Sequence, residues 1–279
     1  MLRVAVPNKG SLAETAAEML REAGYATRRD PKELTLTDAR NAVEFFYLRP
    51  RDIATYVGSG ALEAGITGRD LLIDSGSSAT EVSALGFAGS TFRFAGPVGV
   101  FSDVQQLAGR RIASSYTGLV GGFLQRAGVD ATLVHLDGAV ETAVRLGVAD
   151  AVADVVETGA TLRAQGLAIF GPPILESTAV LIAGAARPPG LEVLQRRLHG
   201  VFVARRYVLV DYDIRRELLD AAALLAPGIE SPTVSPLHDP AWAAVRVMVP
   251  RDDMNVVMDG LYDLGARAIL VTAIHAARL

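Results

Sequence analysis

The chain has 279 residues, of which 50% are apolar and 21% are charged, and its formal net charge is −4. This balance excludes a protein built mainly to bind nucleic acid or an anionic membrane, so any anion site must be local. The sequence contains no cysteine, which excludes thiolate nucleophiles, disulfides and zinc sites built on cysteine.

Targeting and metal signals are also missing from the sequence pattern. Lys9 and Glu14 interrupt the apolar stretch that a signal peptide would need. No run of about eighteen apolar residues, long enough to span a bilayer, occurs. We therefore expect a cytoplasmic protein with neither membrane nor nucleic-acid partners. The histidines are scattered, without the i, i+4 spacing of a zinc-binding helix; they are His135, His199, His238 and His275.

The first part of the chain alternates between predicted strands and helices. An apolar N-terminal strand leads through Pro7 to a helix near Leu12, where Ser11 and Glu14 match a capping box. The next elements continue the alternation: strands at 33–38, 41–49 and 63–68, with a short helix at 50–60.

A second set of elements repeats this order. The pattern predicts strands at 109–116, 130–138 and 149–156, and helices at 118–128, 139–147 and from 160 onward. Residues 57–72 and 144–162 share the order helix, glycine, apolar strand, polar turn and helix, which is a weak internal repeat. Strands that alternate with helices form parallel sheets, so we expect two lobes with a ligand cleft beyond the carboxyl ends of their strands.

The pattern changes after the turn at residues 186–190. Two helices are expected among four strands, in the order β-α-β-β-α-β of the ferredoxin-like motif. We therefore assign residues 206–279 to a separate, compact domain.

Polar residues that could bind a sugar phosphate gather in the stretch 150–162. Asp150 and Asp154 lie in an apolar strand, which runs into the turn Glu157-Thr158-Gly159-Ala160-Thr161 and then a helix. Backbone N–H groups at such a turn bind anions, and a carboxylate can accept hydrogen bonds from ribose hydroxyls. The simpler alternative is a helix N-cap beside a partly buried aspartate.

Three charged residues in the first lobe follow predicted strands. Lys9 lies between the first strand and its helix, Arg49 ends the strand at 41–49, and Asp70 follows the strand at 63–68. A single residue of this kind is normally a solvated surface charge. Three of them at carboxyl ends of strands favour a ligand cleft.

These residues identify the chain as similar to the ATP phosphoribosyltransferase family in its long form, over essentially its whole length. The blocks VPNKGSL, FFYLRPRDI, GITGRDL and ESPTVSPL resemble those of the family. The most specific positions form one signature: Glu141, Gly147, Ala149, Val152, Asp154, Val155 and residues 158–162.

The resemblance implies a fold with three parts. It implies an α/β, two-lobed catalytic part similar to periplasmic binding proteins, with parallel-rich sheets and a cleft. Lobe I would hold residues 1–91 and the returning segment 179–205, and lobe II residues 92–178. Residues 206–279 would form the ferredoxin-like regulatory domain.

The resemblance also implies a reaction. N1 of ATP would displace pyrophosphate from phosphoribosyl pyrophosphate (PRPP), in the first step of histidine biosynthesis, with Mg²⁺ carried by the substrates. It implies catalytic roles for Lys9, Arg49 and Asp154. It implies PRPP binding by Glu141, Asp150, Asp154, Glu157, Thr158, Gly159, Ala160 and Thr161. It implies ATP binding by Lys9, Gly10, Arg49, Gly68, Asp70, Leu71 and Tyr116.

Regulation and assembly follow from the same resemblance. Histidine would inhibit by binding at Asp213, Ser231 and Thr233, and the chain would form a homo-oligomer, a hexamer in exchange with a dimer. Asp213 and Thr233 could equally be ordinary strand residues.

One segment departs from the family pattern. After residues 111–116 the family usually has a proline and then a basic pair, whereas this chain has Thr117-Gly118-Leu119-Val120-Gly121-Gly122. Two alternatives therefore stay open beside the enzyme: a two-lobed solute-binding or sensor protein, and a catalytically impaired paralogue.

Overall fold

The structure is a computed structural model that describes residues 1–156 and 159–278. It divides into two compact units. The first comprises residues 1–21 and 25–195, and the second residues 22–24 and 196–279. The division falls inside helix α6 (Leu191–Arg206), whereas the sequence pattern puts the domain boundary at its end.

Lobe I is built on a six-stranded sheet. Its central strand β1 (Leu2–Pro7) pairs in parallel with β3 (Val43–Leu48) on one side and with β4 (Ala64–Gly68) on the other. The order β2-β3-β1-β4-β11-β5 is completed by β2 (Thr35–Asp38), β5 (Thr80–Ala84) and β11 (Ala179–Ala183). The helices are α1 (Ser11–Glu22), α2 (Pro50–Gly58) and α3 (Arg69–Ser75).

Lobe II repeats this arrangement with five strands. Strand β7 (Arg111–Ser114) pairs in parallel with β8 (Thr132–His135) and β9 (Ala151–Val156). The order β10-β6-β9-β7-β8 is completed by β6 (Ser90–Pro97) and β10 (Leu167–Ser177). The helices are η1 (Val104–Leu107), α4 (Thr117–Ala127), η2 (Val140–Thr142) and α5 (Ala160–Ala164).

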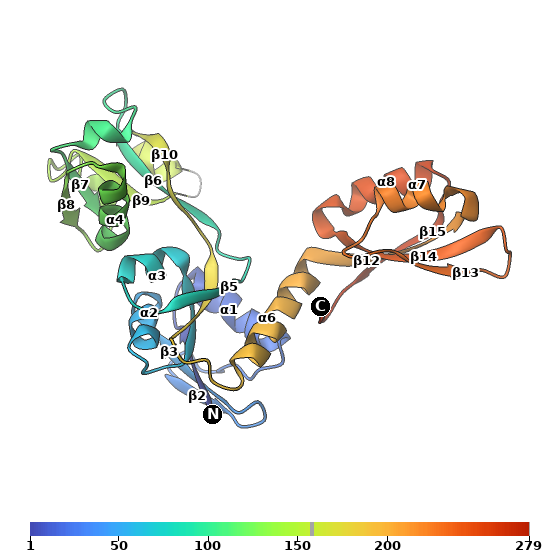
Figure 1. Ribbon diagram of the computed structural model, residues 1–279. Helices are drawn as coiled ribbons and strands as arrows, with labels where there is room; N and C mark the ends of the chain where they lie inside the picture. Colours follow the sequence, from blue (N-terminus) through green and yellow to red (C-terminus); the bar gives the residue numbers. More distant parts are fainter. Residues whose placement is uncertain (157–158, 279) are drawn as a thin grey trace. The chain divides into compact units, whose positions relative to one another are not determined.

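The two lobes confirm the internal repeat expected from the sequence. Each has a parallel trio of strands, and the next strand in the sheet runs antiparallel to it: β11 beside β4, and β6 beside β9. Strand β11 follows lobe II in the chain and returns to the lobe I sheet, as Figure 1 shows. This is the two-lobed, periplasmic-binding-protein-like α/β fold.

Buried apolar side chains fix helix α4 on the lobe II sheet. Phe92 and Phe94 of β6 and Ile112 of β7 pack with Leu119 and Leu124 of α4 in one core cluster. This packing retains the helix despite its three glycines, since tertiary burial outweighs weak helix propensity. The helix expected at 139–147 is wrong, because only the short 3₁₀ turn Val140–Thr142 forms there.

The C-terminal unit has the strand order of the ferredoxin-like motif, which confirms the sequence prediction. Its antiparallel sheet runs β13-β14-β12-β15 and comprises β12 (Tyr207–Arg215), β13 (Thr233–Pro236), β14 (Trp242–Pro250) and β15 (Arg267–Ala273). Its helical segments are η3 (Arg216–Leu218), α7 (Leu219–Leu225), η4 (Arg251–Asp253) and α8 (Met254–Asp263).

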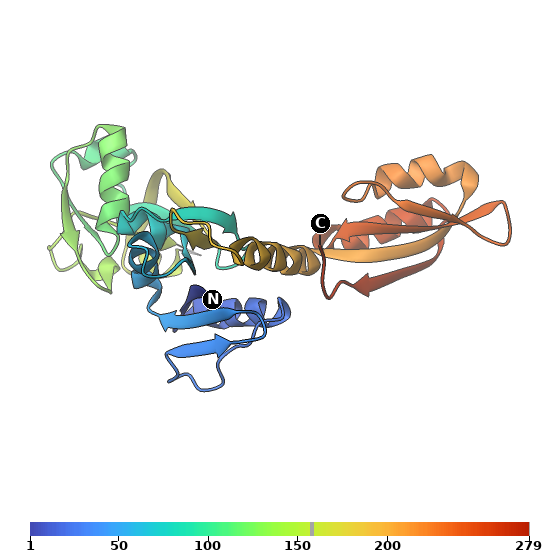
Figure 2. The same ribbon diagram turned by 60° about the horizontal axis from the view of Figure 1, so that its bottom comes forward.

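One face of this sheet is covered and the other is open. Helices α7 and α8 lie on the same face in both views (Figures 1 and 2), and every second residue of β12, such as Val210 and Tyr212, is buried with them. Between these positions, Asp211 and Asp213 point to the opposite face. None of the helices in the described parts of the chain is both long and apolar enough to cross a bilayer.

Candidate active site

The carboxyl edge of the lobe I sheet collects the three charged residues expected there. Lys9 follows β1 and Arg49 follows β3, and the two strands end together because Pro7 is in register with Leu48. Asp70 follows β4, the other neighbour of β1. Lys9 and Arg49 are exposed, so both basic groups can meet a phosphate from solution.

A cavity of about 370 Å³ opens beside this edge, between the two lobes. Its walls come from the starts of α1 and α3, the crossover before β6, the start of α4 and strand β9. The lining residues are Ser11, Leu12, Gly68, Asp70, Leu71, Ala88, Gly89, Ser90, Ser115, Tyr116, Asp154 and Val155. Four residues from the sequence-predicted ATP site, Gly68, Asp70, Leu71 and Tyr116, thus share one cavity with Asp154.

Asp154 is a half-buried carboxylate on the lobe II wall. It lies inside β9, which continues to Val156, in agreement with the strand predicted at 149–156. Burial raises the pKa of its carboxyl; a hydrogen bond from the Val155 N–H, at 2.8 Å, opposes this, and the nearby charge of Glu141 raises the pKa further. The Val155 N–H satisfies only part of this carboxylate, so its remaining oxygen lone pairs can accept hydrogen bonds from sugar hydroxyls.

The described residues that follow β9, from Gly159 to Thr161, are small, and two of them are exposed. Gly159 has a φ of 68° as the residue before α5, a conformation that other residues adopt only with strain. Ala160 and Thr161 are exposed at the start of α5, so the Thr161 hydroxyl is free to meet a ligand. Glu157 and Thr158 lie outside the described residues.

Asp70 joins the two lobes at the cavity. Its carboxylate accepts a hydrogen bond of 2.8 Å from the buried Ser177 hydroxyl, and a β-carbon at Gly68 would collide with it. The Tyr116 side chain of lobe II lies close enough to Asp70 for the charge of that carboxylate to act on it. Burial raises the pKa of Tyr116, and the charge of Asp70 raises it further against the opposing effect of Arg51. Tyr116 is therefore a hydrogen-bond donor in the cavity wall.

Asp150 does not join this group. It precedes β9, and its carboxylate pairs with Arg111 at 3.0 Å and also accepts the Arg111 backbone N–H at 2.9 Å. Hydrogen bonds from the Arg111 guanidinium hold the pKa of Asp150 below its usual value. Since a strand rises about 3.3 Å per residue, four residues separate Asp150 from Asp154 by roughly 13 Å.

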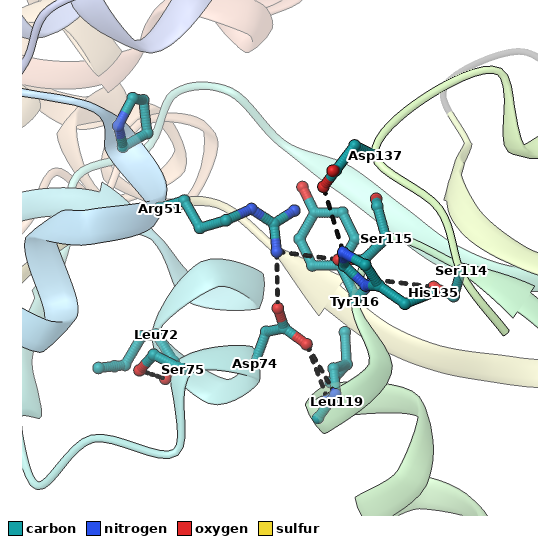
Figure 3. A network of polar contacts seen from close by, with 12 residues as sticks. Arg51, Leu72, Asp74, Ser75, Ser114, Ser115, Tyr116, Leu119, His135 and Asp137 are labelled. Carbon is teal, nitrogen blue, oxygen red and sulfur yellow. Dashed lines mark hydrogen bonds and ion pairs between the residues drawn. The ribbon is translucent and has the colours of Figure 1, made fainter. Parts of the chain in front are cut away.

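The sequence reasoning did not find one polar network beside the cavity, which Figure 3 shows. Arg51 of α2 donates hydrogen bonds of 2.9 Å to Asp74 of α3 and to the backbone oxygen of Ser115 in lobe II. Its guanidinium carbon lies 4.8 Å from the centre of the Tyr116 ring. No sequence signal pairs these residues, because contacts between elements far apart in the chain leave no local pattern.

The C-terminal unit has its own cavity of about 420 Å³ on the open face of the sheet. It is lined by Asp213 and Thr233, two of the three residues predicted for histidine, and also by Arg246 and Ser235. Arg246 pairs with Asp211 at 2.7 Å. The third predicted residue, Ser231, is exposed in the preceding loop and does not line this cavity.

Groups of acidic and histidine side chains are the residue clusters that would hold a metal ion in this chain. Within residues 1–156 and 159–278, no three such side chains come together in a way that could hold an ion. Glu141 and Asp154 are the two carboxylates that lie near one another at the lobe II wall.

Comparisons with known proteins give a consistent match. A family model described as ATP phosphoribosyltransferase matches residues 49–200, and one described as HisG, C-terminal domain, matches residues 204–276. Proteins named ATP phosphoribosyltransferase from Arthrobacter sp. (strain FB24) and Micrococcus luteus are 63% and 64% identical to this chain. The alignments cover 100% of this chain and 100% of each relative.

A solved structure extends the match to three dimensions. The ATP phosphoribosyl transferase (HisG:HisZ) complex from Thermotoga maritima contains a chain that superposes with a TM-score of 0.63 at 25% sequence identity. The match covers 98% of that chain and 72% of this one.

Proposed function

We propose a mechanism from one premise: this chain belongs to the ATP phosphoribosyltransferase family. It is an enzyme that transfers the phosphoribosyl group of PRPP to N1 of ATP, giving phosphoribosyl-ATP and pyrophosphate in the first step of histidine biosynthesis. The sensor alternative is thereby replaced by an enzyme with a two-lobed, binding-protein-like fold.

The chemistry needs positioning more than acid–base help. The neutral N1 of adenine has a lone pair, which forms the new bond to C1 of the ribose. The bond from C1 to the pyrophosphate oxygen breaks, and its electron pair leaves with pyrophosphate. No protein nucleophile is required, so rate enhancement rests on orientation and on charge stabilisation.

Asp154 and the turn after β9 would bind PRPP. Asp154 would accept hydrogen bonds from the ribose hydroxyls, and its negative charge, with that of Glu141, would stabilise the positive charge that develops at C1. Backbone N–H groups at Gly159 and Ala160 and the Thr161 hydroxyl would bind the 5-phosphate. Glu157 and Thr158 belong to the same sequence stretch and would share this role.

Lys9 and Arg49 would meet the phosphates at the other side of the cavity. Both are exposed cations at the carboxyl edge of the lobe I sheet. They would stabilise the negative charge of the leaving pyrophosphate. Asp70, Leu71 and Tyr116 would line the adenine side. Mg²⁺ would be held by the substrate phosphates, the usual ligands of this ion, and would neutralise the leaving group. The assignment to the cytoplasm rests on these phosphorylated substrates, whose charge keeps them from crossing membranes.

The single observation that supports this arrangement is the joint cavity of Asp70, Tyr116 and Asp154. Purified protein supplied with ATP, PRPP and Mg²⁺ should release pyrophosphate and form phosphoribosyl-ATP, and omission of PRPP should abolish both. Ligand binding without PRPP-dependent turnover would contradict the proposal and indicate an impaired paralogue.

We further propose that the cavity in the C-terminal unit binds histidine as a feedback inhibitor. Asp213 suits an ammonium or imidazolium group, Arg246 suits a carboxylate, and Thr233 and Ser235 offer hydroxyls. Inhibition would be allosteric, because this cavity lies in a different unit from the reacting groups.

Substitution of Asp213 tests this regulatory site. Asp213→Ala should raise the histidine concentration that half-inhibits the enzyme by about tenfold, as expected for one charge-assisted hydrogen bond. Asp263→Ala removes an exposed carboxylate at the end of α8 and should leave inhibition unchanged. If histidine inhibits the parent, Asp213→Ala and Asp263→Ala equally, this cavity does not bind the inhibitor.

Assembly as a homo-oligomer, a hexamer in exchange with a dimer, is the remaining part of the proposal. Exposed apolar side chains of the C-terminal unit support it: Leu224 is 85%, Val256 75% and Tyr262 73% exposed. Apolar groups exposed to this extent favour subunit contacts. Light scattering after size exclusion would measure the mass directly.

A further inference from the structure

The contacts that join the two lobes beside the cavity are few and specific. Arg51 and Asp74 belong to lobe I, and Arg51 donates to the Ser115 backbone oxygen of lobe II at 2.9 Å. Asp74 accepts hydrogen bonds from the backbone N–H groups of Gly118 and Leu119 at 2.9 and 3.1 Å. The carboxylate of one lobe thus occupies the first turn of a helix in the other lobe.

This placement answers the electrostatic needs of both partners. The first N–H groups of a helix have no acceptor within the helix and carry partial positive charge, which a carboxylate satisfies. Asp74 Oδ2 meanwhile pairs with Arg51 at 2.9 Å, and the Asp74 side chain is only 11% exposed. The contacts of Asp74 Oδ1 with Gly118 and Leu119 therefore join lobe II to lobe I, and the pairing of Oδ2 with Arg51 holds the carboxylate in place.

The sequence of α4 is fitted to this contact. A β-carbon at Gly118 would collide with the backbone oxygen of Asp74, so α4 can approach α3 this closely only without a side chain at that position. At Gly122, one turn later, a β-carbon would meet only the flexible end of Arg126, at 3.4 Å. Gly118 lies in the segment that departs from the family pattern, and the structure gives that departure a physical use.

The network also fixes a residue of the cavity wall. Tyr116 precedes α4 directly and lines the cavity. Its ring lies under the Arg51 guanidinium (Figure 3). Only the crossover segments around residues 85–90 and 177–179 connect the lobes covalently. Short connections of this kind act as hinges, so noncovalent contacts decide how far the lobes close.

We propose that Arg51, Asp74 and Gly118 form an interlobe latch that holds the cleft closed and positions Tyr116 for substrate binding. The latch residues are positioning residues, since Asp74 does not line the cavity. This inference rests on the proposed function for its kinetic part, whereas the closure of the lobes can be measured without any substrate.

The latch predicts a particular kinetic signature. When only a fraction of the protein is closed, the apparent dissociation constant of every ligand that needs the closed cleft rises by the same factor. Asp74→Asn keeps the shape of the side chain but loses its charge, and it should raise the KM of ATP and of PRPP equally, by about tenfold. At saturating substrate, kcat should stay within about twofold. A residue that touched one substrate would shift only that KM, and partial misfolding would lower kcat alone.

Distance measurement tests the closure directly. The chain has no cysteine, so Thr55→Cys in α2 and Gln125→Cys in α4, both exposed, give one spin label on each lobe. Labelled chains are diluted into unlabelled protein so that only distances within a chain contribute. Without substrates, Asp74→Asn and Gly118→Ala should shift the distribution to longer distances. Gly122→Ala, in the same helix, and Glu63→Gln, which breaks the Arg3–Glu63 pair within lobe I, should not.

The outcomes separate the latch from the catalytic proposal. Distances unchanged in both Asp74→Asn and Gly118→Ala would overturn the latch, even in an active enzyme. A shift in both, with the controls unchanged, supports the latch even if the parent protein does not use PRPP, in which case the proposed function alone fails. If Gly118→Ala does not fold, Asp74→Asn decides the question alone.

Discussion

Two aspartates on the same stretch of chain, one just before β9 and one inside it, lie in opposite surroundings. Asp150, before the strand, is paired with Arg111, and hydrogen bonds from that guanidinium lower its pKa. Asp154, four residues on, is half-buried beside a second carboxylate, Glu141, and burial raises its pKa. Both aspartates look alike in the sequence, and only the surroundings distinguish them.

The difference teaches where ligand binding is encoded in this lobe. A carboxylate that already has a cation gains little from a new partner, whereas one that is desolvated and lacks a cation gains much. Asp154 is therefore suited to bind a ligand, whereas Asp150 serves the structure of the lobe through its pair with Arg111. Each prediction below tests one side of this contrast.

The largest effect is expected from Asp154→Asn. Loss of the charge and of one acceptor for ribose hydroxyls should lower kcat/KM for PRPP by about 10²-fold, since charge-assisted hydrogen bonds contribute about 1.5–3 kcal/mol each. Initial rates of pyrophosphate release measure this. Asp130→Asn changes an exposed aspartate of the same lobe and serves as the control. If kcat/KM of Asp154→Asn stays within threefold of the parent value, Asp154 does not bind the ribose.

A smaller effect is expected at the turn after the strand. Thr161→Val keeps the shape of the side chain but removes a hydroxyl, and it should raise the KM of PRPP by about tenfold while the KM of ATP stays unchanged. Thr132→Val, at another exposed threonine of lobe II, is the matched control. An equal rise in both KM values would argue against a phosphate contact at Thr161.

The sequence predicted the strands and helices of the central trio in each lobe, because apolar runs between glycine turns are strong local signals. It did not predict β5, β6, β10 and β11 as separate strands, since their place depends on partners far away in the chain. Strand β11, for example, pairs with β4 across more than one hundred residues. The pairing of Asp150 with Arg111 and of Asp74 with Arg51 was equally invisible, because contacts between distant charges leave no periodicity.

The next largest effect is expected on the melting temperature, which Asp154→Asn and Asp150→Asn should change in opposite directions. The raised pKa of Asp154 means that its stabilising contribution is present below the unfolded pKa, about 3.9, and is lost as pH rises through the folded value. At neutral pH the ionised group opposes folding. Asp154→Asn should therefore raise the melting temperature by roughly 2–4 °C at pH 7, with the gain vanishing near pH 3. A lower melting temperature at pH 7 would contradict the desolvated environment of Asp154.

The smallest effect is expected from Asp150→Asn, and it has the opposite sign. The lowered pKa of Asp150 means that its contribution to stability is present above the unfolded pKa and is lost as pH falls through the folded value. Because the ion pair is largely exposed, with 47% of the Arg111 side chain accessible, the melting temperature at pH 7 should fall by less than about 3 °C. The deficit should shrink as the solution is acidified below about pH 4, where the parent loses the same charge. The KM of PRPP, measured in parallel, decides whether Asp150 also contacts this substrate. A tenfold rise in Asp150→Asn would indicate that Asp150 binds PRPP, and a change below twofold would indicate a purely structural role.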